Sequence, residues 1–502
     1  MDLRAKNLGI STGGILIAVM NEHDARRGNF HQGDRVCITP HTQKSHKHRT
    51  VAVLDITSND ILVPSGTIGM FVELSKDAHT RAGQHVTVEA TGKPESIEYI
   101  RNKLHGKPFT KKEIETIISD VVNHRLTDIE KTYFVAACFH HELSDAEVVN
   151  LTNAMIGTGE VLKLRKKPVM DKHCIGGVAG NRTTAVVVPI VAAAGLQIPK
   201  TSSRSITSPA GTSDTMEVLC NVCLPIKQMK KVVKETGGCL VWGGAMNLAP
   251  ADDKLIKIEH PISLDPVGQL LASILAKKRS VSATHVLIDI PLGRGAKIDD
   301  EQRALLLKHK FETIGRKLDM HVRVAITDGS EPIGNGIGPA LEARDILWTL
   351  NDDPRGSKML KEKAIELGGI LLEMGKKAKK GEGALLARDL VESGAAYKKF
   401  IDIIEAQGAH ITDAESICLG EFMYEIKAHK SGIIVHVDNE RISQIAKLAG
   451  APKDKVAGLY LYHHKGEHVQ KGDTLYTIYS ASKVKLRTSR KYANNNKGFL
   501  IE

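Results

Sequence analysis

The chain has 502 residues, of which 42% are hydrophobic and 25% are charged, and these values are typical of a globular protein with a large buried core. The formal net charge is +11, but Lys and Arg are spread along the chain and only 4% of the residues are aromatic, so we expect no nucleic-acid partner. No apolar run reaches the ~20 residues that a membrane span needs, and the first residues lack the apolar segment of a signal peptide. We therefore expect a cytoplasmic protein with no membrane partner.

The first third of the chain divides into two patterns. Residues 1–85 alternate apolar and polar side chains in short bursts separated by Gly, Asp, Asn and Pro, which predicts a small β-rich domain. In residues 86–168 the apolar side chains recur at helical spacing, and Thr110, Thr127 and Ser144 stand where N-caps are expected. A glutamate three residues after Ser144 completes a capping-box pattern. A helical domain therefore follows the β-rich one.

The rest of the chain predicts a larger mixed domain. Residues 169–426 alternate short apolar runs with amphipathic segments, which is typical of βα units around a mixed or parallel sheet. Residues 252–282 interrupt this order with a helical pattern that breaks at Pro266. Residues 427–502 return to strand-like alternation and form a C-terminal β-rich portion. The predicted fold class is α/β with an added helical lobe.

Two polar segments flank one apolar run in the α/β part. Residues 171–184 carry paired glycines, a Lys-His dipeptide and hydroxyl side chains, and residues 200–218 are rich in Ser and Thr. Hydroxyls and free backbone N–H groups at this density suit a phosphate, and a helix is expected to begin near Asp214. The alternative is a Ser/Thr-rich surface loop with a helix cap. The apolar run between the segments fits either a strand or a buried helix.

The seven cysteines are odd in number and scattered, which argues against a disulfide framework. Cys220 and Cys223 are the one close pair, and a zinc site would need two further ligands at suitable spacing. We therefore predict no metal site and no cofactor.

The two polar segments resemble those of the thymidine phosphorylase and AMP phosphorylase family of nucleoside phosphorylases. The resemblance is carried by two linked motifs in order, Lys172-His173-Cys174 with Gly176-Gly177-Val178, and Ser202-Ser203-Arg204 with Ala210-Gly211-Thr212, Asp214 and Glu217. It covers the chain from roughly residue 85 to the end, and an added N-terminal domain is a feature of the AMP phosphorylase branch. It implies that residues 252–282 rejoin the helical domain, that the active site lies in a cleft between two lobes, and that the protein is a homodimer or a higher homo-oligomer.

The resemblance also implies roles for individual residues. Asp265 would be the proton donor to the leaving base, although an Asp before Pro is also an ordinary helix cap. The phosphate-binding set would be Lys172, Thr183, Ser202 and Thr212. The substrate-binding set would be His173, Gly177, Ser203, Arg204, Ser205, Ile206, Thr207, Ser208, Thr212, Ser273, Lys277 and Lys297. Ser273 and Lys277 return to one face of a helix, and the alternative for His173 is a structural role.

These residues predict phosphorolysis of the N-glycosidic bond of a nucleoside 5′-monophosphate, with AMP and phosphate giving adenine and ribose 1,5-bisphosphate. Inorganic phosphate is then a co-substrate. Arg204 and Lys297 are the cations expected to bind the second phosphate of a nucleotide. The close alternative is a thymidine or other pyrimidine nucleoside phosphorylase. More distant alternatives are an anthranilate-type phosphoribosyltransferase, with Asp252-Asp253 as a Mg²⁺ site, and a nucleotide-sensing module.

Overall fold

A computed structural model describes residues 1–41, 49–205, 208–262 and 264–502. The contacts divide the chain into two compact units. The first contains Met1–Thr158 and Pro250–Leu270, and the second contains Gly159–Ala249 and Leu271–Glu502. A helical segment from the middle of the sequence is therefore grouped with the N-terminal residues.

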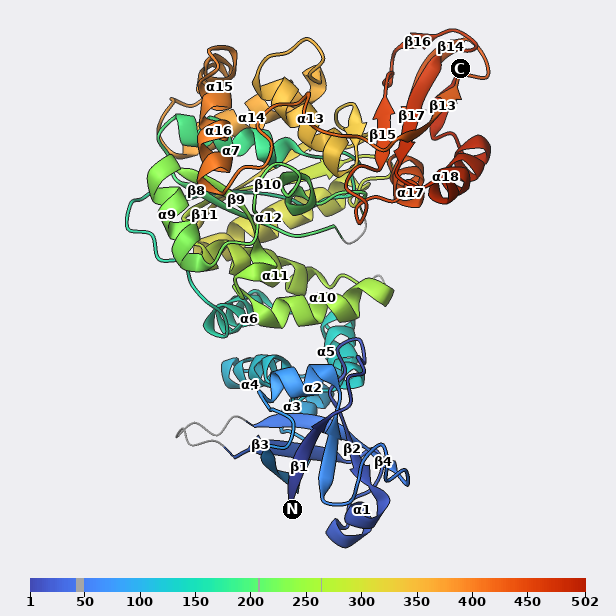
Figure 1. The fold of residues 1–502 in the computed structure, drawn as a ribbon. Coiled ribbons are helices and arrows are strands. Elements are labelled where there is room, and N and C mark those ends of the chain that lie inside the picture. Colours follow the sequence, from blue (N-terminus) through green and yellow to red (C-terminus); the bar gives the residue numbers. More distant parts are fainter. Residues whose placement is uncertain (42–48, 206–207, 263) are drawn as a thin grey trace. The chain divides into compact units, whose positions relative to one another are not determined.

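The first unit begins with a closed six-stranded barrel in the order β1-β5-β2-β4-β3-β6 (Figure 1). Its elements are β1 (Asp2–Asn7), β2 (Ile17–Asn21), α1 (Glu22–Gly28), β3 (Arg35–Pro40), β4 (Thr50–Thr57), β5 (Thr67–Met70), α2 (Val72–Asp77) and β6 (His85–Ala90). Because β6 pairs with both β1 and β3, the barrel extends past the boundary expected near residue 85. Inward-facing apolar side chains such as Met20, Leu54 and Ile68 fill its interior.

The same unit continues as a helical bundle. Its helices are α3 (Ser96–Leu104), α4 (Lys111–Val122), α5 (Asp128–His140), α6 (Asp145–Gly157) and α10 (Pro250–Ile262), and α10 packs on α4, α5 and α6. The three predicted N-caps are confirmed, since Thr110, Thr127 and Ser144 each form a capping box with the glutamate three residues later. Each box satisfies backbone N–H groups that the first helical turn leaves unpaired.

The second unit is built on parallel strands, as the alternating pattern predicts. The strands β7 (Met170–Cys174), β10 (His285–Leu292) and β11 (His321–Asp328) pair in the order β11-β10-β7, and β8 (Ile198–Ser202) pairs with β9 (Gly238–Trp242). A bridge between Val169 and Gln197 lies between the two groups. The helices are α7 (Thr183–Ala193), α8 (Thr212–Met216), α9 (Ile226–Thr236), α11 (Val267–Ser280, which belongs to this unit from Leu271 on), α12 (Glu301–Lys317), α13 (Pro339–Leu350), α14 (Lys358–Met374), α15 (Gly383–Glu392) and α16 (Ala395–Ala406), with a 3₁₀ turn at Gly243–Ala245.

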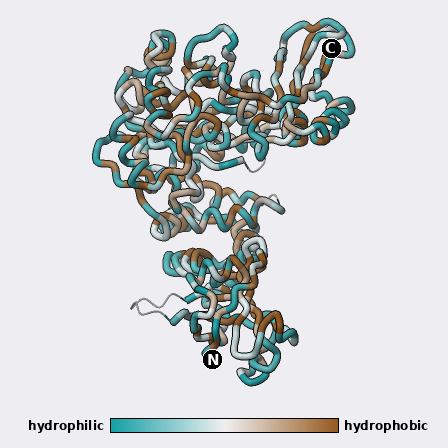
Figure 2. The backbone as a smooth tube through the Cα atoms, viewed as in Figure 1, coloured by the Kyte–Doolittle hydropathy of each residue, from teal (hydrophilic) through white to brown (hydrophobic). Residues whose placement is uncertain are grey.

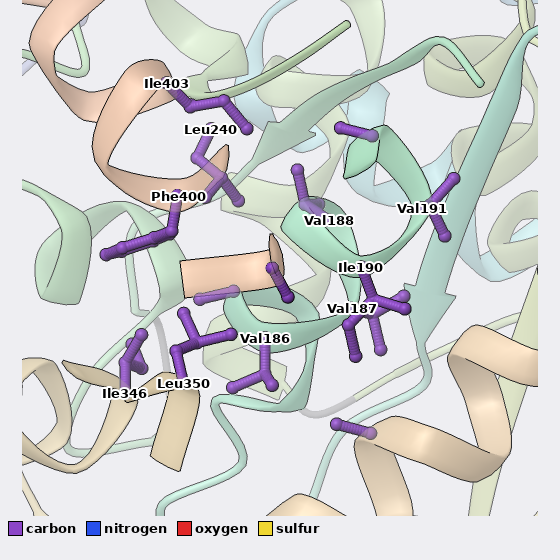
Figure 3. Packing of buried hydrophobic residues seen from close by; sticks show 14 of the residues in the cluster. Val186, Val187, Val188, Ile190, Val191, Leu240, Ile346, Leu350, Phe400 and Ile403 are labelled. Carbon is purple, nitrogen blue, oxygen red and sulfur yellow. The ribbon is translucent and has the colours of Figure 1, made fainter. Parts of the chain in front are cut away.

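The apolar run between the two polar segments is a helix, α7, at the centre of the second unit. Its residues from Thr183 to Ala192 are all buried. Leu240, Phe400 and Ile403 lie near Val188 in the packing around this helix (Figure 3). A helix covered on every side needs no polar face, which explains why its sequence shows no helical periodicity. Along the backbone of both units, hydrophobic stretches alternate with hydrophilic ones, as the colouring by hydropathy in Figure 2 shows.

The C-terminal portion of the second unit is rich in strands. Its elements are β13 (Phe422–Lys427), β14 (Gly432–Val437), α17 (Asn439–Ala449), β15 (Gly458–Leu461), β16 (His468–Val469), β17 (Thr474–Ser480), α18 (Lys483–Asn495) and β18 (Phe499–Ile501). The short strand β12 (Gly336–Ile337) joins the sheet β12-β15-β17-β13, and β16-β14-β18 form another. Since β13 begins at Phe422, the strands start before the boundary expected at residue 427. Among the described helices, none has the length and apolar character that a membrane span requires.

Candidate functional site

Lys172 and His173, from the first polar segment, lie on strand β7. Lys172 is completely buried, and its Nζ lies 3.1 Å from Oδ2 of Asp289 on the neighbouring strand β10. The hydroxyl of Thr327 donates to the other oxygen of Asp289 at 2.6 Å. Asp289 thereby fixes the Lys172 ammonium group within the sheet.

A second carboxylate on β7, Asp171, faces two further buried lysines. Lys278 Nζ lies 3.1 Å from Oδ2 of Asp171, and Lys200 Nζ lies 3.6 Å from Oδ1. Lys200 also donates to the carbonyl of Lys172 at 2.6 Å. The lysines at 172, 200 and 278 are at most 4% exposed, and we call them the buried lysine cluster. Two carboxylates face the three lysines of the cluster, and Lys363 Nζ also lies 4.0 Å from Oδ1 of Asp289.

Burial is the largest cause of the lowered pKa values of Lys200 and His173, and the positive charges of the cluster act in the same direction. Burial, and then the nearby Lys278 ammonium, hold the pKa of Lys200 well below its usual range. Burial followed by the charges of Lys278 and Lys200 holds the pKa of His173 well below 6.5, so that its imidazole is neutral at pH 7. An anion beside His173 would supply the missing negative charge.

The loop after β7 requires glycine at residue 177. Gly177 has a φ of +90°, and a Cβ at this position would lie 2.0 Å from the backbone nitrogen of Lys297. The loop after β7 therefore touches the loop after β10 that carries Lys297. Thr183 begins α7 and is buried, and its hydroxyl donates to Oδ1 of Asn181 at 2.9 Å.

Asp214 organises the Ser/Thr-rich loop. Its Oδ2 accepts from the backbone N–H groups of Ser205 at 2.7 Å and Gly211 at 3.0 Å. Ser202 ends strand β8, and its hydroxyl lies 2.7 Å from that of Ser213. The Ser205 hydroxyl donates to the carbonyl of Ser208, so it contributes to the loop's own structure.

Among the other predicted residues of this loop, the structure describes Ser203 and Thr212. Ser203 is exposed, and Thr212 is the half-buried first residue of α8. The predicted residues Ile206 and Thr207 lie outside the described part of the chain.

Arg204 is already paired with acidic side chains. This pairing corrects the argument that Arg204 is a spare cation for the second phosphate of a nucleotide. Its guanidinium donates to both oxygens of Glu217, at 2.7 and 2.5 Å, and lies 3.3 Å from Asp214. It also stacks over Trp242 at 4.8 Å. The hydrogen bond from Arg204 lowers the pKa of Glu217 to about 2. Lys455 Nζ lies 2.9 Å from Glu217, so the carboxylates of Asp214 and Glu217 are already paired with two cations, Arg204 and Lys455.

The other predicted residues lie on or near α11 and after β10. Ser273 and Lys277 stand one turn apart on α11 and are half-buried, and Lys297 is exposed. Asp265 is half-buried between α10 and α11, and it falls in the first compact unit. Within the second unit, the structure thus brings together Lys172 and His173 on β7, the loop that contains Gly177, and the loop that contains Lys297.

Cys174 follows Lys172 and His173 on strand β7. All seven cysteines are free, and the Cys174 thiol, 3.1 Å from the Asn181 amide nitrogen, has a pKa raised by burial to about 11. In the part of the chain that the structure describes, no group of His, Cys, Asp and Glu side chains is arranged to hold a metal ion.

Sequence reasoning missed Asp171, Lys200, Lys278 and Asp289. Each is buried at a strand or helix position where a charged side chain is unexpected, and that is the signal that could have found them. A charged residue inside an apolar run, such as Asp289 in His285–Leu292, indicates a buried partner of opposite charge.

Similar proteins identify the family. Residues 97–159 match the helical bundle domain and residues 166–397 the a/b domain of the glycosyl transferase family, and residues 433–498 match the pyrimidine nucleoside phosphorylase C-terminal domain. The AMP phosphorylase of Pyrococcus furiosus is 45% identical, with 96% of this chain and 94% of that protein covered. A Legionella pneumophila protein named "Putative thymidine phosphorylase" is 44% identical, with 96% and 92% covered. The chain therefore belongs to the thymidine phosphorylase and AMP phosphorylase family.

A solved structure agrees with the fold. The anthranilate phosphoribosyltransferase of Thermus thermophilus superposes with a TM-score of 0.51 over 61% of this chain and 98% of that one. With 16% identical residues, this likeness shows a shared helical and α/β fold and says nothing about the reaction.

Glu342 on α13 contacts α8, and its raised pKa leads us to predict that the free energy of unfolding depends on pH. Its carboxyl group accepts from the Thr215 hydroxyl at 3.0 Å, and burial raises its pKa to about 7 from an ordinary 4.5. A raised carboxyl pKa favours the protonated form in the folded state, so this stabilisation is complete below pH 4.5 and is lost as the pH rises through 7. Glu342→Gln should therefore match the parent near pH 4.5 and exceed its free energy of unfolding at pH 8 by roughly 3 kcal/mol or less.

Urea denaturation at both pH values measures this effect. Glu217→Gln is the matched control with the opposite sign, because the lowered pKa of Glu217 stabilises the fold above pH 4.5 and that stability is lost as the pH falls through 2. A Glu342→Gln variant that is less stable than the parent at pH 8 would contradict the assignment.

Proposed function

We propose that this protein is a pentosyltransferase that cleaves AMP with inorganic phosphate, giving adenine and ribose 1,5-bisphosphate. The observation that carries the proposal is the buried lysine cluster, where three ammonium groups face two carboxylates beside His173. An anion that enters this site gains charge-assisted hydrogen bonds in a region of low dielectric. The names of relatives add support, since AMP phosphorylases of Pyrococcus furiosus and Methanococcus vannielii are 45% and 42% identical over nearly the whole chain.

Phosphate is already a nucleophile, so the protein must supply position and charge. We assign the phosphate contacts to Lys172, Thr183, Ser202 and Thr212. Lys172 is buried on β7 and Thr183 is buried at the start of α7. Ser202 ends β8 and Thr212 begins α8, so all four belong to the second unit. Holding phosphate in line with the sugar carbon removes much of the entropic cost of the reaction.

The departing base needs a proton, and we assign its delivery to Asp265. A carboxylic acid at the base nitrogen would neutralise the negative charge that develops as the glycosidic bond breaks. The cleft between two lobes that the resemblance implies remains part of this proposal.

The remaining assigned residues would bind the sugar, the base and the 5′-phosphate. Gly177 allows the loop after β7 to pass directly against the backbone of Lys297, which suits a loop pair that encloses a small ligand. We assign Lys297 to the 5′-phosphate, and His173, Ser273, Lys277 and the Ser203–Ser208 loop to the sugar and base. We expect no cofactor besides phosphate, a homodimer or higher homo-oligomer, and a cytoplasmic location.

Thymidine phosphorolysis is the second candidate. It is favoured by the Legionella pneumophila relative named for that activity and by Arg204, whose pairing with Glu217 removes one of the two cations expected to bind a 5′-phosphate. The AMP proposal therefore depends on Lys297 more than the sequence suggested.

The test is phosphate-dependent release of free base from AMP, adenosine, thymidine and uridine. AMP should be cleaved with a kcat/KM at least ten-fold above that of each nucleoside. Lys297→Ala should lower kcat/KM for AMP by about ten-fold or more, because a charge-assisted hydrogen bond contributes roughly 1.5–3 kcal/mol, and should leave adenosine nearly unchanged. Equal cleavage of AMP and thymidine, or an equal loss on AMP and adenosine in the variant, would replace AMP by thymidine as the assigned substrate.

A separate prediction concerns the proton. Asp265→Asn removes the acidic proton with little change in shape, so turnover should fall by about 10²- to 10⁴-fold while KM changes little. Asp253→Asn, an exposed carboxylate on α10, is the matched control and should keep the parent turnover. Turnover near that of the parent in a folded Asp265→Asn variant would reject Asp265 as the acid.

A further inference from the structure

One buried carboxamide in the C-terminal portion contacts the loops that follow three parallel strands. Asn439 is the first residue of α17 and has no exposed surface. Its Oδ1 accepts from the backbone N–H of Ala179 at 3.0 Å, and its Nδ2 donates to the carbonyl of Gly329 at 3.0 Å. Ala179 lies in the loop after β7, and Gly329 follows β11.

The third loop, after β10, packs on the same side chain. A Cβ on Gly295 would lie 3.4 Å from the Cβ of Asn439. This loop also carries Lys297, whose backbone nitrogen lies against Gly177. Asn439 therefore touches both of the loops that meet at the contact between Gly177 and Lys297.

The position of Asn439 is itself firmly held. Asp438 caps α17 by accepting from the N–H groups of Glu440 and Arg441, both at 3.0 Å. Ile442 and Ile445, further along the helix, are completely buried in the core of the C-terminal portion. A side chain fixed in this way can impose its geometry on the loops that bond to it.

We infer that Asn439 is a positioning residue, through which the C-terminal portion sets the spacing of the Gly177 and Lys297 loops around the nucleotide. The inference rests on the proposed function, and it names a part of the chain to which that function gives no role. A carboxamide fits this position because the loop after β7 offers one N–H and the loop after β11 offers one carbonyl, and Asn has both an acceptor and a donor at the end of a short side chain. Aspartate would keep the acceptor and place a carboxylate oxygen against the Gly329 carbonyl.

The experiment compares Asn439→Ala with Gln407→Ala. Gln407 is the matched control because it is 1% exposed, accepts from the Leu240 N–H at 2.8 Å and donates to the carbonyls of Leu240 and Asn221 at 3.0 and 3.1 Å. Both variants lose a buried carboxamide that joins backbone segments, so both should unfold at lower urea concentration. Asn439→Ala alone should raise KM for AMP by about ten-fold or more, with KM for phosphate changed by less than about three-fold.

Asn439→Asp serves as the second variant if Asn439→Ala does not fold, and it should show the same selective rise in KM for AMP. Parent-like KM for AMP in a folded Asn439 variant, or an equal rise in Gln407→Ala, would overturn the positioning role and leave the proposed function intact. A parent protein that releases no adenine from AMP would refute the proposed function and this inference together.

Discussion

The pairing of the buried lysine cluster with only two carboxylates, Asp171 on β7 and Asp289 on β10, is the constraint on which the rest of the site depends. Transfer of each ammonium group out of water costs several kcal/mol, and a carboxylate at hydrogen-bonding distance offsets that cost only where it can reach the group. Asp289 faces Lys172, and Asp171 faces both Lys200 and Lys278. Burial and then the lysine charges lower the pKa of His173. The unmatched charge is the basis of the affinity for an anion that we propose.

The C-terminal portion of the chain contributes to this region at two points. Lys455 pairs with Asp214 and Glu217, which also hold Arg204, and it thereby fixes the Ser/Thr-rich loop. Asn439 joins the loops after β7 and β11. In open α/β sheets, ligands bind beyond the carboxyl ends of parallel strands, and these two contacts stiffen loops at that end of the sheet. A β-rich portion that appears peripheral in sequence thus shapes the loops assigned to the substrate.

Much of the fold could be predicted from the sequence, because its signals are local. The capping boxes at Thr110, Thr127 and Ser144 and the strands at His285–Leu292 and His321–Asp328 follow from spacing alone. The nature of α7 did not, since an element buried on all sides shows neither helical nor strand periodicity. For the site, the sequence allowed prediction of the two motifs but not of the contacts that their residues make. The pairing of Arg204 with Glu217, and of Lys278 with an aspartate 107 residues away, depends on tertiary contacts that no local pattern encodes.

The location of a bound anion tests the central claim most directly. Crystals of the full chain soaked in tungstate, a heavy analogue of phosphate, would reveal the anion by its anomalous scattering. The account predicts a peak at the carboxyl end of β7, within hydrogen-bonding distance of His173 or Thr183 and of at least one lysine of the buried lysine cluster. A peak confined to exposed basic side chains, such as those of α18, would show that the buried lysine cluster does not form the phosphate site.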